Sequence, residues 1–298
     1  MRPETAVAPA EDRSPATYAS FAVMCLVWGS TFLAIRIGNE SVAPVWSAVV
    51  RLSIATPLYF LIALLSRAPW PRGAALGAAL LYGFLNYGLN FALLYRGEVQ
   101  VSSGTASILY ATIPLITVIA VARLGLQRLR SHEIWGALIG LAGVALVFSG
   151  ELSGGGPPLA LAAVFVGAIA AALSAVALKL GPPQSTWPAN ALGSAVGLAV
   201  CCAVSLALGE RWTLPRGTAG WAPILYLIAT GNLIAYALFG WLLTKWKVTS
   251  VNAMSLVIPV IAVFLGAAIR AEAPGPGTIL GAALVLAGVS LTLFVGRR

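Results

Sequence analysis

Amide and aromatic side chains recur at helical spacing inside otherwise apolar stretches of this 298-residue chain. Tyr82, Asn86 and Asn90 are each four residues apart, so on a helix they share one face. An asparagine amide in lipid hydrocarbon is costly unless it is paired, so it must face other helices or water. Aromatic rings stack on planar or apolar ligands, and amides bind polar heads. These residue types are therefore suited to binding a small molecule.

Similar faces occur on several other stretches. The candidate substrate-binding residues are Trp28, Phe32, Tyr82, Asn86, Asn90, Ser107, Tyr110, Asn232, Tyr236, Asn252 and Ser255. For any single asparagine the alternative is that its amide bridges two helices. For the set, faces shared with tyrosine and serine favour a common cavity. The alternative for the aromatic residues is an interfacial belt, which suits the tryptophans near the ends of apolar stretches, Trp46, Trp70, Trp212 and Trp221.

Catalytic chemistry has little support in the sequence. No Asp or Glu falls within an apolar stretch, and His132 is the only histidine. A membrane-embedded enzyme would need a nucleophile with a base, a metal cluster or paired buried acids. The cysteines, Cys25, Cys201 and Cys202, indicate neither a disulfide framework nor a zinc site. We therefore predict no enzyme activity, no metal and no cofactor, and the sequence contains no GxxxxGK[ST] phosphate loop.

Composition excludes the soluble classes. Hydrophobic residues make up 59% of the chain and charged residues 9%, and the mean hydropathy is +0.92. A soluble domain has roughly 25% charged residues. The net charge of +9 comes from basic residues spread singly between apolar runs, which argues against nucleic-acid binding. A soluble enzyme and a disordered protein are excluded as well.

The elements that position these side chains are membrane-spanning helices, each needing roughly 20 apolar residues. We predict an all-α membrane protein with ten of them, over residues 18–36, 44–66, 73–95, 101–122, 133–150, 157–178, 187–208, 219–243, 248–269 and 276–295. Residues 1–17 are predicted to be a disordered cytoplasmic tail. With this count, twelve Lys and Arg lie on the side of the amino terminus and five on the opposite side, with Arg51 inside a span. The bias predicts that both termini are cytoplasmic.

The two halves of the chain resemble each other. Residues 136–146 read GALIGLAGVAL and residues 281–291 read GAALVLAGVSL, with seven of eleven positions identical at an offset of 145. The same offset carries Pro114 onto Pro259. We therefore predict two five-helix repeats, over residues 18–150 and 157–295. Chance similarity in a chain rich in Gly, Ala, Leu and Val is the alternative.

Five spans are an odd number, so the second repeat enters the membrane from the opposite side. Inverted repeats are common in secondary transporters, with the substrate site near the midplane between the halves. Pro114 and Pro259 are candidate gating hinges, and a static kink is the alternative. The glycines of the fifth and tenth spans suit close helix contact, so we assign these spans to a scaffold or a dimer interface. Arg51 either meets a substrate carboxylate or has a structural role, and we favour the structural role.

Several motifs together resemble the drug/metabolite transporter superfamily, and most closely its ten-helix EamA-type exporters. They are the doubled five-span repeat, the proline in the fourth and ninth spans, the shared G-A-x-x-x-L-A-G-V ending, the Trp28-Gly29-Ser30-Thr31 run, and Pro44 followed by Arg51. The resemblance covers residues 18–295. It implies export of amino acids or other metabolites, and one subgroup of the family exports aromatic amino acids.

The combined prediction is a membrane transporter that exports small metabolites by alternating access, with aromatic or large apolar amino acids as substrates. Four-helix multidrug pumps of the same superfamily rely on a buried carboxylate, which the predicted spans lack, so we expect a facilitator or exchanger. The alternative is a drug or other metabolite efflux transporter with ion coupling. A channel or receptor fits the inverted repeat less well. The expected partners are the substrate and the lipid bilayer of the cell inner membrane, and the chain is expected to act as a monomer or homodimer.

Overall fold

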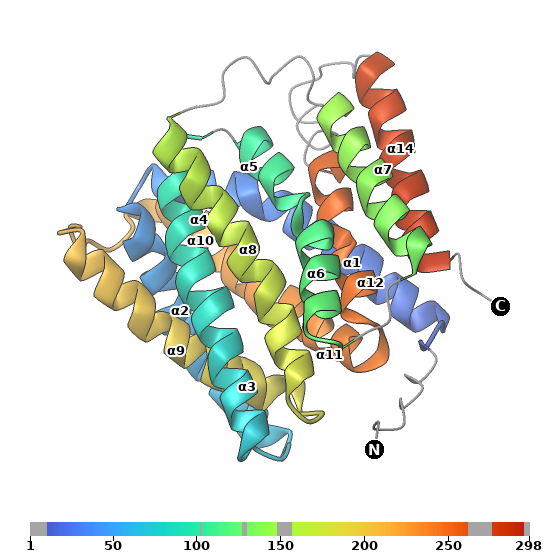
Figure 1. Cartoon of the computed structure of the whole chain (residues 1–298). Helices are drawn as coiled ribbons and strands as arrows, with labels where there is room; N and C mark the ends of the chain where they lie inside the picture. The colour runs from blue at the N-terminus through green and yellow to red at the C-terminus, as the bar shows by residue number, and fades with distance from the viewer. Residues whose placement is uncertain (1–10, 102, 127–129, 148–156, 262–275, 295–298) are drawn as a thin grey trace.

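The computed structural model describes residues 11–101, 103–126, 130–147, 157–261 and 276–294, which form a helical bundle without strands (Figure 1). In the first half lie α1 (Pro15–Asn39), α2 (Pro44–Leu65), α3 (Ala74–Gly83), the π-helix η1 (Phe84–Asn90), α4 (Phe91–Gly97), α5 (Ser103–Tyr110), α6 (Ile113–Arg123) and α7 (Ser131–Val147). In the second half lie α8 (Pro158–Leu180), α9 (Thr186–Ala207), α10 (Gly217–Tyr226), the π-helix η3 (Leu227–Tyr236), α11 (Ala237–Lys245), α12 (Val248–Asn252), a helical stretch over 254–261, and α14 (Pro276–Phe294).

Local sequence sets many of the helix ends. Proline occupies the first turn of α1, α2 and α8, where its missing N–H costs nothing and its fixed φ suits a helix. After α9 the chain reverses at Gly209, whose φ of 63° lies in the left-handed region that favours glycine. Each predicted span contains helix in its described part, and two spans are interrupted by short turns, at residues 111–112 and at Ala253. The all-α prediction is therefore confirmed for the described residues.

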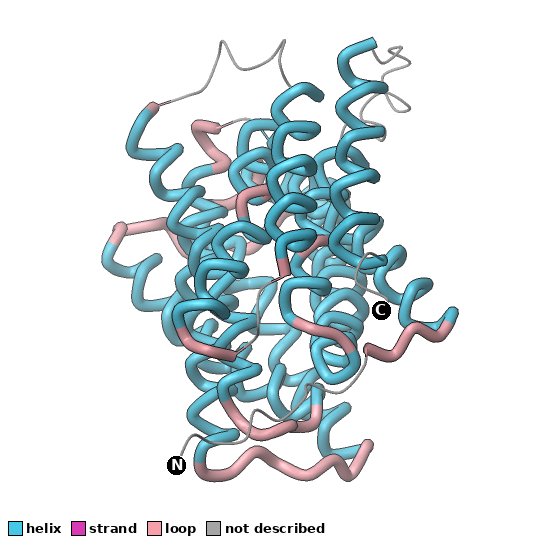
Figure 2. The backbone as a smooth tube through the Cα atoms, turned by 45° about the vertical axis from the view of Figure 1, so that its right-hand side comes forward, coloured by secondary structure: helices cyan, strands magenta, loops and turns pink. Residues whose placement is uncertain are grey.

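Seven helical stretches among the described residues are long and apolar enough to cross a membrane. They comprise α1, α2, the continuous run α3–η1–α4, the run Thr105–Arg123, α8, α9 and the continuous run α10–η3–α11. Three apolar helices are shorter, over Ser131–Leu146, Val248–Ile261 and Ile279–Leu293. Figure 2 shows from a second side that helices make up most of the described backbone. The chain is thus a multi-pass membrane protein.

The two π-helices occupy equivalent places in the two halves. The offset of 145 carries residues 84–90 onto 229–235, inside η3. A π-helix bonds each carbonyl to the fifth residue onward, which widens the turn and disturbs the regular pairing of the backbone. Side chains from other helices use the carbonyl groups of these segments. Tyr59 of α2 donates to the carbonyl of Asn232 at 2.6 Å, and the Asn190 amide of α9 donates to that of Tyr236 at 3.3 Å.

Helices of one half pack mainly on helices of the other. The first helix α1 packs on the run α10–η3–α11, and its counterpart α8 packs on the run α3–η1–α4. The equivalent helices α2 and α9 pack on each other, as do α7 and α14. The main contacts between the halves thus have counterparts made by the equivalent elements in exchanged roles, which is the pattern expected of a pseudo-twofold axis.

The pair α7 and α14 lies at one edge of the bundle and meets through glycines (Figure 1). The sequence predicted close helix contact for these two spans but not that they pack on each other. A Cβ atom added at Gly143 would lie 2.7 Å from the carbonyl oxygen of Gly281. One added at Gly288, the equivalent of Gly143, would lie 2.5 Å from the carbonyl oxygen of Gly136, the equivalent of Gly281. The amino-terminal part of each helix therefore meets the carboxyl-terminal part of the other. The two helices are antiparallel, and the contact is symmetric.

The amino-terminal end of α2 is capped from the second half of the chain. The Glu210 carboxylate accepts hydrogen bonds from the backbone N–H groups of Val45 at 3.1 Å and Trp46 at 2.8 Å. These N–H groups have no partner within their own helix, and a negative charge suits this end of the helix dipole. Trp46 also stacks on Trp212, with ring centroids 4.6 Å apart. Two of the tryptophans assigned to an interfacial belt thus pack on each other across the halves.

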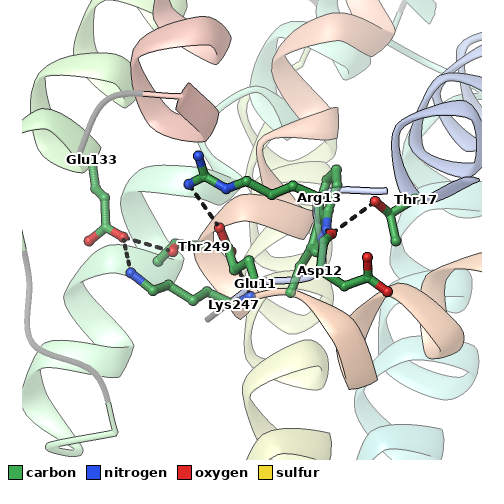
Figure 3. A network of polar contacts seen from close by, with 8 residues as sticks. Glu11, Asp12, Arg13, Thr17, Glu133, Lys247 and Thr249 are labelled. Carbon is green, nitrogen blue, oxygen red and sulfur yellow. Dashed lines mark hydrogen bonds and ion pairs between the residues drawn. The ribbon is translucent and has the colours of Figure 1, made fainter. Parts of the chain in front are cut away.

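The first described residues bind the junction between α11 and α12 at the opposite end of the bundle (Figure 3). The backbone N–H of Lys247 donates to Glu11 at 2.9 Å, and the indole N–H of Trp246 donates to the carbonyl of Asp12 at 2.5 Å. Helix α1 then begins at Pro15. The structure therefore differs from the tail predicted through residue 17, because these acidic residues find partners on a later helix. Residues 1–10 lie outside the described part.

The same network reaches α7. The Lys247 ammonium lies 3.6 Å from the Glu133 carboxylate, which is almost fully buried and also accepts a hydrogen bond from Thr249 at 3.4 Å (Figure 3). An ion pair with one buried partner is screened less by salt than a surface pair. The network therefore joins three segments that are far apart in the chain: residues 11–14, the junction before α12, and the start of α7.

Gly143→Ala is expected to destabilise the protein. The added methyl group collides with backbone atoms of α14 that cannot move independently, and such overpacking costs about 1–3 kcal/mol. Thermal unfolding of the purified protein in detergent measures the effect. Gly77→Ala on α3 is the matched control, because a Cβ atom there meets nothing within 4 Å. Equal unfolding temperatures for the two variants would show that the glycine contact is unimportant.

Candidate functional site

A cavity of about 80 Å³ lies among helices of both halves, enough to hold several water molecules. Its aromatic walls are Trp28, Phe32, Phe91, Tyr110, Tyr236 and Phe239. Its polar side chains are Thr31, Arg51, Asn86, Asn90, Asn252 and Ser255. The remaining lining residues are Ile35, Leu94, Ile113, Ala171, Met254 and Ile258. No described residue of α7 or α14 lines it, which agrees with the scaffold role predicted for those helices.

The aromatic rings that line the cavity pack on one another mostly edge-to-face. Trp28 of α1 meets Tyr236 of η3 with ring centroids 5.0 Å apart and an interplanar angle of 69°. On another wall, Phe32 of α1 meets Tyr110 of α5 at 5.4 Å and 83°. Edge-to-face pairs of this kind add about 0.5–1.5 kcal/mol beyond the burial of their area. The walls are therefore ordered surfaces on which an apolar or aromatic group can pack.

Arg51 is the charged side chain that reaches this cavity, and it is 2% exposed. Its Nε donates a short hydrogen bond to the Asn232 side-chain oxygen, and its Nη1 donates to the Tyr95 hydroxyl at 3.0 Å. The guanidinium carbon lies 4.7 Å from the centre of the Phe91 ring, a cation–π contact. Gly231 leaves room for Nη2, since a Cβ atom there would lie 2.9 Å from it.

The charge of Arg51 has no counter-ion in the part of the chain that the structure describes. None of the ion pairs there involves this residue, and no described residue forms a hydrogen bond with its Nη2. A guanidinium carries five N–H donors, and paired donors of this kind match a carboxylate. A buried charge is costly until it is paired. The arrangement thus fixes two donors of Arg51 and leaves others for a ligand.

The cavity asparagines are partly satisfied. Tyr110 donates a short hydrogen bond to the Asn90 side-chain oxygen, and the Asn252 amide donates to Thr117 at 2.7 Å. The Asn86 amide nitrogen is buried without a hydrogen-bond partner among the described residues. Each unsatisfied buried amide costs about 1–3 kcal/mol. Asn86 can therefore gain a hydrogen bond from a ligand, whereas Asn252 is already held in place.

Eight of the eleven predicted binding residues line the cavity. Trp28, Phe32, Asn86, Asn90, Tyr110, Tyr236, Asn252 and Ser255 are brought together there. Ser107 is fully buried but is not part of the lining, and Asn232 contacts the cavity only through Arg51. Tyr82 faces α9 instead, where it donates to the Asn190 side-chain oxygen at 3.0 Å.

The two candidate hinge prolines differ in setting. Pro114 lies in the first turn of α6, directly after the turn at residues 111–112 that separates α5 from α6. Proline is tolerated there because its missing N–H would be unpaired anyway. Pro259 lies inside the helical stretch 254–261, and the helix break on this side falls at Ala253. Each proline thus follows an interruption of its own span, Pro114 by two residues and Pro259 by six.

A polar cluster beside the cavity was missed by the sequence interpretation. Asn190 of α9 accepts hydrogen bonds from Tyr82 at 3.0 Å and from Tyr87 at 3.1 Å. Tyr87 also lies 3.2 Å from the Tyr59 hydroxyl. Asn190 stands near the start of α9, and Ser194 shares its face four residues later, a pair that the sequence interpretation did not single out. The cluster joins α2, α3, η1 and α9.

No group of three or more His, Cys, Asp or Glu side chains suited to a metal ion occurs within the described ranges.

Two matches of the EamA-like transporter family model cover residues 16–149 and 158–294. The chain belongs to the EamA-like transporter family. The resemblance to the drug/metabolite transporter superfamily predicted from the motifs is confirmed.

Several EamA-like relatives are similar over most of their length. Uncharacterized inner membrane transporter YedA of Escherichia coli K12 is 31% identical over 252 residues, or 83% of this chain and 80% of YedA. A probable terminal-alkyne amino-acid exporter of Streptantibioticus cattleyicolor is 26% identical over 92% of this chain and 91% of that protein. A probable amino-acid metabolite efflux pump of Salmonella typhimurium is 24% identical over 91% and 93% of the two chains.

A solved crystal structure shares the fold of this EamA-like chain. It superposes with a TM-score of 0.74 at 20% sequence identity, over 95% of this chain and 98% of the other. At this identity the likeness concerns the fold alone. The bundle with its interlocked halves is thus an architecture already seen by experiment.

Asn190→Leu is expected to lower stability by about 1–3 kcal/mol, because two buried tyrosine hydroxyls lose their acceptor. Thermal unfolding in detergent is the measurement. Tyr226→Phe is the matched control, since this tyrosine also donates or accepts one side-chain hydrogen bond, with Ser30, but is 38% exposed. If both variants unfold at the wild-type temperature, the Asn190 cluster does not stabilise the bundle.

Proposed function

We propose that this protein exports amino acids with aromatic or large apolar side chains across the cell inner membrane by alternating access. The observation that carries the proposal is Arg51, a buried cation without a counter-ion beside a cavity with aromatic walls. The guanidinium pairs with the substrate carboxylate, the rings of Trp28 and Tyr236 pack on its side chain, and the Asn86 amide meets a polar group. Relatives named as amino-acid exporters and as an inner membrane transporter support the substrate class and the location.

The mechanism follows from the two halves. Ten spans in two inverted five-helix repeats, residues 18–150 and 157–295, place the cavity between units of similar structure. Such units can exchange conformations, so that an inward-open state and an outward-open state have similar energies. The symmetric seam of α7 and α14 and the interlocked packing of the other helices support this arrangement. Both chain ends are proposed to be cytoplasmic, and Pro114 and Pro259 to bend during gating.

Transport is proposed to be of the facilitator or exchanger type. Among the described residues, no carboxyl group lines the cavity in which the substrate would bind. A carboxylate that bound the substrate and a proton in turn is the usual means of coupling to a proton gradient. Without it, the substrate gradient drives the flux.

Arg51→Gln is expected to reduce efflux of labelled phenylalanine from proteoliposomes about ten- to hundred-fold, since hydrogen bonds to a charged group contribute about 1.5–3 kcal/mol. Phenethylamine, which lacks the carboxylate, is expected not to be transported. Arg96→Gln is the matched control, because Arg96 is exposed at the end of α4. Export of phenethylamine or of cationic drugs at rates unaffected by Arg51→Gln would refute the amino-acid proposal.

Asn232→Asp is expected to abolish transport while leaving the fold intact. The new carboxylate takes the place of the amide that already contacts Arg51 and becomes its permanent counter-ion. The unfolding temperature should therefore equal or exceed that of the wild type, whereas phenylalanine efflux falls. Wild-type efflux by a stable Asn232→Asp protein would mean that the charge of Arg51 does not bind the substrate.

A further inference from the structure

Glu98 is a buried carboxyl group with no partner. It follows the last residue of α4, and its backbone N–H donates to the carbonyl of Leu94 at 2.9 Å. The residue is 2% exposed, and neither of its carboxyl oxygens has a hydrogen-bond partner among the described residues. Other acids of the described chain do have partners: Glu210 caps α2, and Glu11 and Glu133 belong to the network at the other end. A buried polar group that stays unpaired calls for an explanation.

The position of Glu98 links it to the cavity. Asn86, Asn90, Leu94 and Glu98 follow one another at intervals of four residues, and the first three line the cavity. At 1.5 Å per residue, Glu98 lies about 6 Å beyond Leu94 along the helix. The end of α1 is nearby, since the Asn39 amide donates to the carbonyl of Tyr95 at 3.2 Å. Glu98 therefore lies between the cavity and the end of the bundle that is predicted to face away from the cytoplasm.

Arg36 in the last turn of α1 acts electrostatically on Glu98, and Glu98 in turn acts on two tyrosines of the surrounding elements. The tyrosines are Tyr110 at the end of α5 and Tyr95 on α4 itself. Arg36 is exposed and forms no ion pair with Glu98. Burial raises the pKa of the Glu98 carboxyl well above its usual range, and Arg36 opposes the shift only in part. In this conformation burial therefore favours the neutral form of the carboxyl group.

We propose that Glu98 binds a proton when this end of the bundle closes and releases it when this end opens. The inference rests on the proposed alternating access, which requires that the site open at this end in one state. Opening admits water to Glu98, and the hydrated carboxyl ionises with an ordinary pKa. Closing returns it to an environment in which only the neutral form is stable. The charge of Glu98 acts on Tyr110, and the Tyr110 hydroxyl donates a hydrogen bond to Asn90, which lines the cavity. Tyr110 therefore links the protonation of Glu98 to the cavity.

The sign of the pH dependence follows from linkage. The pKa of Glu98 is raised in the closed state and is near its ordinary value of 4.5 in the open state. Between these two pKa values, Glu98 therefore keeps its proton in the closed state and loses it in the open state. Between these two pKa values, each fall of one pH unit favours the closed state by at most about tenfold. Acid on this side of the membrane therefore keeps the exit closed and slows export. Because the proton exchanges with one side alone, it regulates the flux and does not drive it.

Carbodiimide labelling tests the protonation state in the wild-type protein without any transport. Dicyclohexylcarbodiimide reacts with protonated carboxyl groups in apolar surroundings, and mass spectrometry of the purified protein locates the label. We expect Glu98 to be labelled at pH 7, with labelling lost only as the pH rises further. Exposed Glu40, which ends α1 on the same side, is the internal control and should not react at pH 7. Absence of label on Glu98 above pH 5 would overturn the proposal.

Efflux measured against external pH tests the consequence. Wild-type phenylalanine efflux from proteoliposomes should fall several-fold as the external pH is lowered from 8 to 6. Glu98→Gln mimics the neutral form, so it should keep the slow, acid-like rate at every pH. Glu40→Gln should retain the wild-type profile. A Glu98→Gln protein with the wild-type pH profile would overturn the proposal. If no variant transports phenylalanine, the amino-acid proposal fails, whereas the labelling result for Glu98 still decides its protonation.

Discussion

A bilayer core contains no water, so each buried polar group of this protein must find its partner inside the bundle. The Arg51 guanidinium shows how this constraint organises the centre. It is held by Asn232, which belongs to a π-helix, and by Tyr95, which belongs to the helix that follows the other π-helix. One charged side chain thus ties the two widened helices of the two halves to α2. Around it, Tyr59 and Asn190 use backbone carbonyls of the second π-helix. Most polar groups at the centre thus find partners within the chain, whereas the Asn86 amide nitrogen and further N–H donors of Arg51 have none among the described residues.

The polar centre also limits which parts of the bundle can move. The Arg51 and Asn190 clusters join α2 and α9 to both widened helices, whereas α7 and α14 contact mainly each other. The two ends of the bundle are closed by different chemistry. One end has an ionic and hydrogen-bonded network that includes residues 11–14, and the other has the Glu210 cap, the stacked tryptophans and the unpaired Glu98. An alternating motion must break one set at a time, and only the second set contains a carboxyl group without a partner.

Much of the fold could be predicted from local sequence. Apolar runs bounded by Pro15, Pro44 and Pro158 became α1, α2 and α8 within a few residues, because span length and proline geometry act locally. Close helix contact by α7 and α14 could be foreseen because small residues permit close approach, but the sequence did not indicate that these two helices meet each other. The helical segment 248–269 could be followed only to residue 261, and the rest of it lies outside the described residues.

The site was harder to predict, for reasons of geometry. Tyr82 shares a four-residue spacing with Asn86, but the helix changes from α to π between them, which rotates the following residues about the axis. Tyr82 consequently faces α9 while Asn86 faces the cavity. Side chains of other helices contact carbonyl groups of the π-helices, and no periodic pattern in the sequence encodes such contacts. For Arg51 the sequence left two roles open, and whether a buried cation has a counter-ion depends on residues far away in the chain.

The seam between α7 and α14 has a consequence for how such a chain can arise. Its contact is of the isologous kind found in homodimers with C2 symmetry, in which both partners contribute the same surface. A polypeptide corresponding to one half of this chain already carries everything this contact needs, since α7 and its equivalent α14 meet antiparallel through equivalent surfaces. Gene duplication and fusion would then preserve an existing association. Each glycine along the seam thereafter faces the descendant of its own ancestral partner.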